Sequence, residues 1–345
     1  MIYFDCDYMD AAHPLIMEKM LQCNGEKNQT YGTDDYCKRA SEKIRKACGT
    51  PDAEVHFMVG GTQTNATVID ALLRPYEGVV AADTAHINVH EAGAIETSGH
   101  KVLTIPHRNG KIDCNDLEIY LKKFQDDLNK EHTVYPGMVY VSHPTEYGTL
   151  YTQAELRQLS AICQAHHLPL YLDGARLPYA LVAEESDVTL RDVAAFCDVF
   201  YIGGTKNGAM FGEAVVFKNK LIPHFFTYKK LHGALLAKGW LLGMQFDVLF
   251  TDDLYLANAR HALKMADLIR NTFRNHGYRF YIESPTNQVF VVMKNETIDR
   301  LQAEFSFSVW EKYDESHKIV RFVTTWSTLP EEVEQLDAAL SRNLF

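Results

Sequence analysis

The chain has 345 residues, 46% of them hydrophobic, which is enough to bury a sizeable core and suggests one large and one smaller domain. Its 34 basic and 45 acidic residues give a formal net charge of −11, which argues against nucleic acid as a partner because phosphates bind basic surfaces. We find no apolar run of about 18 residues that would span a membrane, and no secretory signal. The seven cysteines are scattered and include no C-x-x-C pair. They therefore favour a reducing cytoplasm over a disulfide framework or a metal site.

The first predicted elements are an extended arm and two helices. Residues 4–10 form the arm, and Pro14 is suited to the first turn of a helix with apolar residues along one side. A loop at Tyr31-Gly32 then leads to an amphipathic helix over residues 35–48, which Gly49 is expected to end.

A glycine turn follows the first predicted sheet strand, residues 54–59. Gly60-Gly61-Thr62 opens a helix that stops before Pro75, with Thr62 or Thr64 as its candidate cap. A glycine turn at a helix N-terminus offers free N–H groups and the positive end of the helix dipole, so it predicts an anion site. The absence of G-x-G-x-x-G makes a dinucleotide a poor fit.

Two histidines come directly after the next buried strand, residues 78–82. His86 and His90 lie on one side if the segment between them is helical. Either is a candidate to take a proton from a substrate hydroxyl. A metal site would need a third ligand, which the neighbouring sequence does not supply.

Strands and helices alternate through the middle of the chain. We expect strands at residues 102–106, 138–142 and 170–173, and helices at residues 116–128 and 155–167. This order is typical of an open α/β sheet that is mainly parallel, in which ligands bind beyond the carboxyl ends of the strands.

Asp173 and Lys206 are candidates for one site at such strand ends. A carboxylate at the end of a buried strand is costly unless it meets a cation. Lys206 lies 33 residues later (206 − 173), on a Gly-rich turn, where a lysine holds a phosphate or forms a Schiff base with a carbonyl. A nucleotide P-loop fits poorly because Asn207 follows the lysine and a strand, not a helix, comes next.

The pattern changes after residue 250, so we divide the chain into a large domain, residues 1–250, and a smaller α+β domain, residues 251–345. A helical region at residues 229–240 ends the first. A long helix capped by Asp252 or Asp253 begins the second, followed by strands at residues 279–282, 288–293, 305–310 and 319–326. Arg321 in the last strand needs an anion if it points inward, and arginine grips a carboxylate with two hydrogen bonds.

The motif D-G-A-R at residues 173–176, followed by a strand that ends in G-T-K at residues 204–206, resembles the low-specificity threonine aldolases. These belong to the fold type I class of enzymes dependent on pyridoxal 5′-phosphate. The resemblance covers essentially the whole chain. It implies roles around the cofactor for the following residues: Lys206 as the Schiff-base lysine, Asp173 at the ring nitrogen, His86 stacked on the ring, and Gly61, Thr62 and Asn65 at the phosphate.

The resemblance also implies contacts to the substrate and to a second subunit. Arg321, helped by Arg176, would bind the α-carboxylate, Tyr31 would reach toward the active site, and Lys238 would contact a neighbouring subunit's phosphate. Two motifs depart from the family. Asp5-Cys6-Asp7 replaces R-S-D, which makes Cys6 a candidate substrate contact, and S-H-P-T-E replaces E-N-T-H-N, which leaves the roles of His143 and Glu146 open.

The activity implied is retro-aldol cleavage of L-threonine, L-allo-threonine and related β-hydroxy amino acids to glycine and an aldehyde, by a homodimer or homotetramer that shares its active sites. A β-eliminating lyase acting on another amino acid is the first alternative, and a non-catalytic binding protein on the same scaffold is the second. The exact substrate, the stereochemical preference at the β-carbon and the catalytic base stay open.

Overall fold

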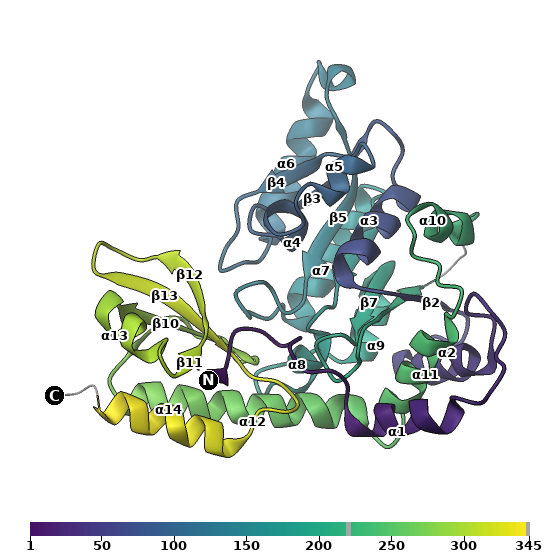
Figure 1. Cartoon of the computed structure of the whole chain (residues 1–345). Helices are drawn as coiled ribbons and strands as arrows, with labels where there is room; N and C mark the ends of the chain where they lie inside the picture. Colours follow the sequence, from purple (N-terminus) through teal and green to yellow (C-terminus); the bar gives the residue numbers. More distant parts are fainter. Residues whose placement is uncertain (219–221, 343–345) are drawn as a thin grey trace.

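A seven-stranded sheet forms the centre of the larger part of the chain (Figure 1), in a computed structural model that describes residues 1–218 and 222–342. Its strands are β2 (Glu54–Met58), β3 (Glu77–Ala82), β4 (Val102–Ile105), β5 (Tyr135–Ser142), β6 (Leu170–Asp173), β7 (Val199–Gly203) and β8 (Glu213–Phe217). They lie in the order β2-β8-β7-β6-β5-β3-β4, with parallel pairing from β7 to β4. Strand β8 runs antiparallel to both of its neighbours. The mainly parallel α/β sheet predicted from the sequence is confirmed.

The carboxyl ends of β6 and β7 come unusually close together. Every residue of both strands is buried, as their apolar sequences predict for central strands covered on both faces. A Cβ atom on Gly174 would lie 2.0 Å from the carbonyl oxygen of Tyr201, and one on Gly203 would lie 2.3 Å from that of Ala175. Only glycine fits at either position, so the turns that follow Asp173 and precede Lys206 lie side by side.

Helices surround this sheet (Figure 1). They are α1 (Pro14–Cys23), α2 (Asp35–Cys48), α3 (Gly61–Leu72), α4 (His86–Val89), α5 (Ala94–Thr97), α6 (Cys114–Asp126), α7 (Gln153–Ala165), α8 (Leu177–Val182), α9 (Leu190–Phe196), α10 (Phe225–Leu231) and α11 (Trp240–Leu249), with a 3₁₀ turn at Lys130–His132. Two expectations were wrong. The N-cap residue of α3 is Gly60, which has no side chain to cap the helix, so neither Thr62 nor Thr64 is the cap. Residues 232–239, between α10 and α11, are not helical.

The smaller part contains a four-stranded antiparallel sheet, in the order β12-β13-β10-β9, and a separate hydrophobic core. Its elements are α12 (Leu254–Asn275), β9 (Arg279–Ile282), β10 (Gln288–Lys294), α13 (Asn295–Leu301), β11 (Phe305–Ser306), β12 (Ser308–Lys312), β13 (His317–Val323) and α14 (Pro330–Arg342). The long helix α12 packs against α14 here and against α8 in the larger part (Figure 1). Asp253 is the N-cap residue of α12, but its side chain pairs with Arg260 and makes no cap.

The single strand expected at residues 305–310 is two strands. β12 joins the antiparallel sheet, whereas β11 pairs in parallel with β1 (Ile2–Tyr3) from the N-terminal arm. The buried ring of Phe4 stacks on Phe305, with ring centroids 6.4 Å apart. The arm therefore begins in the core of the smaller part and then crosses to the larger part.

Within the described ranges, no helix combines the length and apolar character needed to cross a membrane. The same residues bring no three His, Cys, Asp or Glu side chains together as a metal site requires. All seven cysteines are free thiols.

Candidate active site

A cavity of about 340 Å³ opens where the carboxyl ends of the parallel strands meet the N-terminus of α3. Among the residues that line it are these predicted site residues: Gly61, Thr62, His86, His90, Asp173, Arg176 and Lys206. They come from four separate segments of the sequence, and the parallel sheet brings them to one edge.

Asp173 is a buried carboxylate with four hydrogen-bond donors. Tyr140 Oη and Asn65 Nδ2 donate to its Oδ2 at 2.5 and 3.1 Å, and Tyr201 Oη and Ala175 N donate to its Oδ1 at 2.5 and 2.9 Å. Burial alone would raise the pKa of Asp173, but the nearby charge of His86 and these hydrogen bonds hold the pKa below its ordinary value. Asp173 is therefore ionised and suited to a protonated ring nitrogen.

Asn65, which the resemblance assigns to the phosphate, hydrogen-bonds to Asp173 in this structure. Its Nδ2 also donates to Glu91 Oε1 at 2.7 Å, and its Oδ1 accepts from Tyr171 Oη at 2.7 Å. The side chain is buried and does not line the cavity. This geometry gives Asn65 the task of positioning the carboxylate.

Lys206 extends into the cavity from a turn fixed by buried contacts. Tyr179 Oη donates to the Lys206 carbonyl at 2.5 Å, and Asn207 Nδ2 donates to the Tyr255 carbonyl at 2.7 Å. No described hydrogen bond or ion pair holds its amine, which lies 5.8 Å from the centre of the Tyr8 ring. Burial, and next the charge of Arg176, lower the pKa of Lys206. A neutral amine is the form that attacks a carbonyl carbon.

Glu213 also lines this cavity, although no sequence pattern points to it. It is the first residue of β8, and its Oε2 accepts from the backbone N–H of Gly204 at 3.0 Å. Burial raises the pKa of Glu213 to about 8, partly offset by a hydrogen bond from Thr205. A protonated carboxyl group near Lys206 is compatible with a neutral lysine.

The N-terminus of α3 faces the cavity with its backbone uncapped. Gly60, Gly61 and Thr62 line the cavity, and no side chain caps the helix. Free N–H groups at a helix start attract a phosphate. A Cβ atom on Gly61 would lie 3.0 Å from Tyr201 Oη, so a larger residue would crowd this wall.

His86 and His90 face each other, with ring centroids 5.6 Å apart. His86 Nδ1 shares a hydrogen bond of 2.7 Å with Glu91 Oε1, which fixes its ring. Burial lowers the pKa of His90, and the charges of His86 and Arg321 lower it further. His90 is therefore neutral at physiological pH.

The two residues with open roles, His143 and Glu146, face opposite ways. Glu146 lines the cavity, and its Oε1 accepts from His86 N at 2.9 Å and Ser142 Oγ at 2.7 Å. His143 is buried outside the cavity, and its Nδ1 accepts from Tyr151 N at 3.3 Å.

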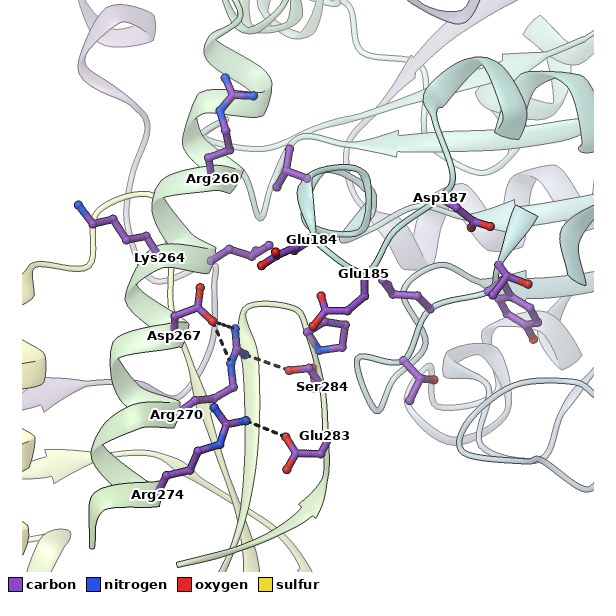
Figure 2. Close-up of a pocket in the computed structure, with 17 residues that line it drawn as sticks. Glu184, Glu185, Asp187, Arg260, Lys264, Asp267, Arg270, Arg274, Glu283 and Ser284 are labelled. Carbon is purple, nitrogen blue, oxygen red and sulfur yellow. Dashed lines mark hydrogen bonds and ion pairs between the residues drawn. The ribbon is translucent and has the colours of Figure 1, made fainter. Parts of the chain in front are cut away.

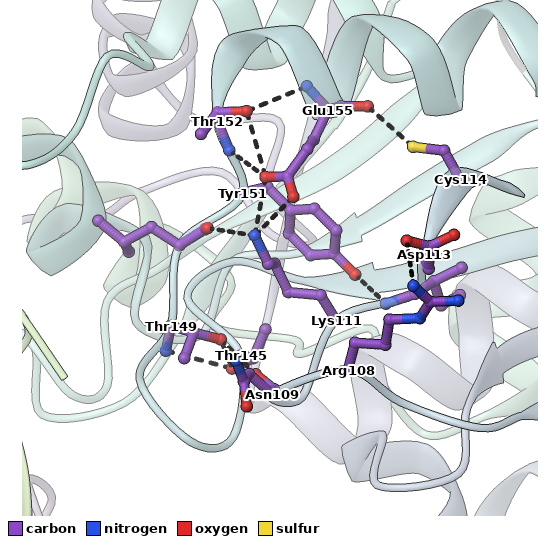
Figure 3. A network of polar contacts seen from close by, with 12 residues as sticks. Arg108, Asn109, Lys111, Asp113, Cys114, Thr145, Thr149, Tyr151, Thr152 and Glu155 are labelled. Atoms are coloured by element: carbon purple, nitrogen blue, oxygen red, sulfur yellow. Dashed lines mark hydrogen bonds and ion pairs between the residues drawn. The ribbon is translucent and has the colours of Figure 1, made fainter. Parts of the chain in front are cut away.

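Through Tyr151, His143 connects to the polar network drawn in Figure 3. There, Tyr151 Oη accepts from the backbone N–H of Ile112 at 2.7 Å, and Lys111 Nζ lies 2.6 Å from Glu155 Oε1. This network supports the loop that carries Glu146.

Arg176 is held by Asp7, whereas Arg321 forms no ion pair with an acidic side chain among residues 1–218 and 222–342. Arg176 Nε and Nη2 donate to the two oxygens of Asp7 at 2.7 and 2.9 Å. Arg321 Nη1 donates to Gln288 Oε1 at 3.1 Å, its Nε is buried without a partner, and its guanidinium lies 4.8 Å from the centre of the Trp310 ring. Burial, and next the charge of Arg176, lower the pKa of Arg321 to about 10.

Arg321 is therefore a largely buried cation that an incoming carboxylate would neutralise. Cys6 does not line the cavity, although its thiol is close enough to act on the pKa of Arg321.

Tyr31 and Lys238 lie away from this cavity. Both side chains are exposed, and the backbone N–H of Tyr31 donates to the carbonyl of Ala237 at 3.1 Å, which joins the two loops. Lys230 Nζ lies 5.1 Å from the centre of the Tyr31 ring. The two predicted residues thus share one surface that does not face the cavity of their own chain.

A larger cleft, about 640 Å³, lies between α12 and the segment after α8 (Figure 2). None of the predicted site residues lines it. Arg270 donates to Asp267 and to the Ser284 carbonyl, and Arg274 pairs with Glu283 (Figure 2). The arginines of this cleft are mostly paired with carboxylates or carbonyl groups of the protein. We therefore assign the chemistry to the smaller cavity.

The smaller cavity fits pyridoxal 5′-phosphate. It provides an unpaired lysine amine for the aldehyde, an ionised carboxylate for the ring nitrogen and an uncapped helix start for the phosphate.

Comparisons with known proteins agree with this fit. Residues 7–296 match the beta-eliminating lyase family. The chain is 30% identical to the low specificity L-threonine aldolase of a Pseudomonas species, over 97% of this chain and 96% of that one, and 31% identical to that of Pseudomonas aeruginosa, over 96% and 95%. The solved structure of Leishmania major threonine aldolase has a TM-score of 0.97 at 40% identity, with both chains covered completely. Aspartate aminotransferase from Thermus thermophilus, at 14% identity over 100% of this chain and 92% of that one, has a TM-score of 0.70 and shows the shared fold.

The fold and the cavity define a lyase of the fold type I class, whose cofactor is pyridoxal 5′-phosphate. The chain belongs to the beta-eliminating lyase family, and its resemblance to the threonine aldolases is confirmed.

Proposed function

We propose that this chain cleaves L-threonine, L-allo-threonine and related β-hydroxy amino acids to glycine and an aldehyde. The observation that carries the proposal is that one cavity gathers Lys206, Asp173 and the start of α3, with the unpaired cation Arg321 near it. The names of the Pseudomonas and Leishmania relatives support this choice of substrate.

The cofactor, when bound, supplies an electron sink for the pair of electrons released at Cα. Lys206 would hold the cofactor's aldehyde through its neutral amine, which burial favours. Asp173 would keep the ring nitrogen protonated, and the N–H groups of Gly61 and Thr62 would hold the phosphate. His86, whose ring is fixed by Glu91, would contact the ring of the cofactor.

Arg321 would select which bond at Cα breaks. It would hold the α-carboxylate to one side, with Arg176 next to it, and so orient the Cα–Cβ bond for cleavage. Because Arg176 is already bound to Asp7, Arg321 carries most of this contact.

The test is Lys206→Ala together with analysis of the products. The wild type should show the visible absorbance band of lysine-bound cofactor and should release acetaldehyde from threonine, and the variant should lose both. Wild-type activity in the variant would refute the proposal. Release of pyruvate from serine in place of acetaldehyde from threonine would favour a β-eliminating lyase, and a protein that binds the cofactor without turnover would be a binding protein.

Assembly and location are part of the same proposal. We place the enzyme in the cytoplasm as a homodimer or homotetramer, with residues 1–250 as the cofactor domain and residues 251–345 as the smaller domain. The free thiols support a reducing compartment, and the separate core of the smaller part supports the division. The shared surface of Tyr31 and Lys238 supports a contribution to a second copy's cavity.

A further inference from the structure

A second cavity of about 270 Å³ adjoins the cofactor cavity. Its lining residues are Thr84, Val89, His90, Glu146, Tyr147, Trp310 and Glu311. His90 and Glu146 line both cavities, whereas Glu311 accepts a hydrogen bond from Tyr147 Oη at 3.1 Å. The Trp310 ring is 5.9 Å from the His90 ring and stacks on the guanidinium of Arg321. The side cavity therefore begins between the cofactor cavity and the predicted carboxylate site.

This arrangement fixes where a substrate side chain would lie. Suppose that an amino acid binds with its amine next to Lys206 and its carboxylate at Arg321. Only the positions of its side chain and its α-hydrogen then remain to be assigned. The side cavity is the space next to Arg321, so the β-carbon would lie at its mouth, facing His90 and Glu146.

Both histidines have other contacts. Glu91 fixes His86 through Nδ1, and we assign the ring of His86 to the face of the cofactor. The Arg321 and Arg176 charges weaken His90 as a base, and its ring packs on Trp310.

Glu146 has the geometry of a proton acceptor. Its Oε1 is fixed by His86 N at 2.9 Å and Ser142 Oγ at 2.7 Å, whereas no described hydrogen bond occupies its Oε2. Burial raises the pKa of Glu146, and the charge of Asp173 adds to this, so its carboxylate is a stronger base than an exposed one.

Several titratable groups surround Glu146. From the cofactor cavity and its wall these are His86, His90, Asp173, Arg176, Lys206, Glu213, Tyr140 and Tyr151, and from the side cavity Tyr147 and Glu311. Because Asp173 is negatively charged, it disfavours a second negative charge nearby. It therefore stabilises Glu146 in the protonated form that results from a proton transfer.

Resting on the proposed function, we propose that Glu146 takes the proton from the substrate's β-hydroxyl. The O–H pair of electrons forms the carbonyl of the leaving aldehyde, and the Cα–Cβ bond breaks with its electrons left at Cα. The proton resides on Glu146 and returns to solvent after the aldehyde departs, while a proton adds to Cα to complete glycine.

Three readouts on Glu146→Gln test this assignment: cofactor binding by visible absorbance, exchange of the glycine α-hydrogen in deuterated water by NMR, and acetaldehyde release from threonine. Glycine has no β-hydroxyl, so its exchange needs the cofactor and Lys206 but no base for that group. We expect threonine cleavage to fall about 10²–10⁴-fold, with absorbance and glycine exchange retained. Glu146→Asp should recover part of the lost rate, and His90→Asn should lose much less than Glu146→Gln.

Threonine cleavage at the wild-type rate by Glu146→Gln would overturn the assignment. Loss of glycine exchange or of cofactor binding in that variant would also overturn it, because Glu146 would then maintain the structure of the site and not act as the base. A larger loss in His90→Asn would transfer the role to His90 and also overturn it. If the wild type itself shows neither the visible band nor glycine exchange, the proposed function fails, and this assignment fails with it.

Discussion

Asp7 and Arg176 form a buried two-point ion pair, with N–O distances of 2.7 and 2.9 Å, between the N-terminal arm and the turn after β6. Asn287 Nδ2 also donates to Asp7 Oδ2 at 2.9 Å. The sequence departs from the family at two of the three residues of this motif but keeps this aspartate.

Asp7→Ala should destabilise the protein by about 3–5 kcal/mol, because it leaves the Arg176 guanidinium buried without a counter-charge. Urea denaturation of the two proteins measures the change. Glu304→Ala, which breaks the exposed pair with Arg342, is the matched control and should cost no more than about 1 kcal/mol. Equal effects would mean that the buried pair is not formed.

Tyr201→Phe should act mainly on the enzyme without cofactor. The four donors saturate Asp173, so a ring nitrogen must displace one of them. Removal of the Tyr201 hydroxyl should cost about 1.5–3 kcal/mol in the apoenzyme and clearly less once the cofactor supplies a replacement donor. Denaturation with and without pyridoxal 5′-phosphate measures both values. Tyr171→Phe, which loses only a bond to Asn65, should not show this dependence on the cofactor, and equal losses in both forms of Tyr201→Phe would contradict the argument.

Arg321→Ala should raise KM for threonine by the equivalent of about 2–5 kcal/mol, the cost of losing a buried charged contact. The visible absorbance of the lysine-bound cofactor should stay, because Arg321 does not line the cofactor cavity. Steady-state kinetics with Arg274→Ala as a surface control separates this effect from a general one, since Arg274 pairs with Glu283 at the exposed cleft. An unchanged KM would remove Arg321 from the substrate site.

His143 should make the protein sensitive to acid. Burial, and next the charge of Lys111, lower the pKa of His143 from 6.5 to about 4. The unfolded chain therefore binds this proton more readily between those pH values, and stability is lost as the pH falls from about 6.5 to 4, by up to about 3 kcal/mol. His143→Gln should flatten this part of the stability curve, whereas His132→Gln at an exposed position should not. Denaturation series at pH 4.5 to 7 decide the point, and parallel curves for wild type and His143→Gln would show that another group is responsible.

The sequence was sufficient to predict the cofactor cavity in outline, because the carboxyl ends of parallel strands meet at one edge. Asp173, Lys206 and the Gly60-Gly61 turn were found by this rule. Glu213 escaped it for a physical reason. β8 is antiparallel, so its first residue lies at the edge where its neighbours end, opposite Gly203 in the register.

The donors to Asp173 could not be predicted either. Tyr140 and Tyr201 lie inside buried strands on either side of β6, and which face they present depends on strand order. The sequence pattern assigns Asn65 to the phosphate because it lies near the start of a helix. Asn65 is one turn into that helix, and its side chain donates to Asp173.

The N-terminal arm limits how the two parts of the chain can move against each other. The backbone N–H groups of Ile2 and Phe4 donate to residues 304 and 306 in the smaller part, whereas Asp7 is held by Arg176 in the larger part and by Asn287 in the smaller part. A hinge rotation of the smaller part would therefore pull on Asp7 and on its neighbour Tyr8. Mechanical coupling of this kind would let a ligand at Arg321 shift the position of the Tyr8 ring next to Lys206.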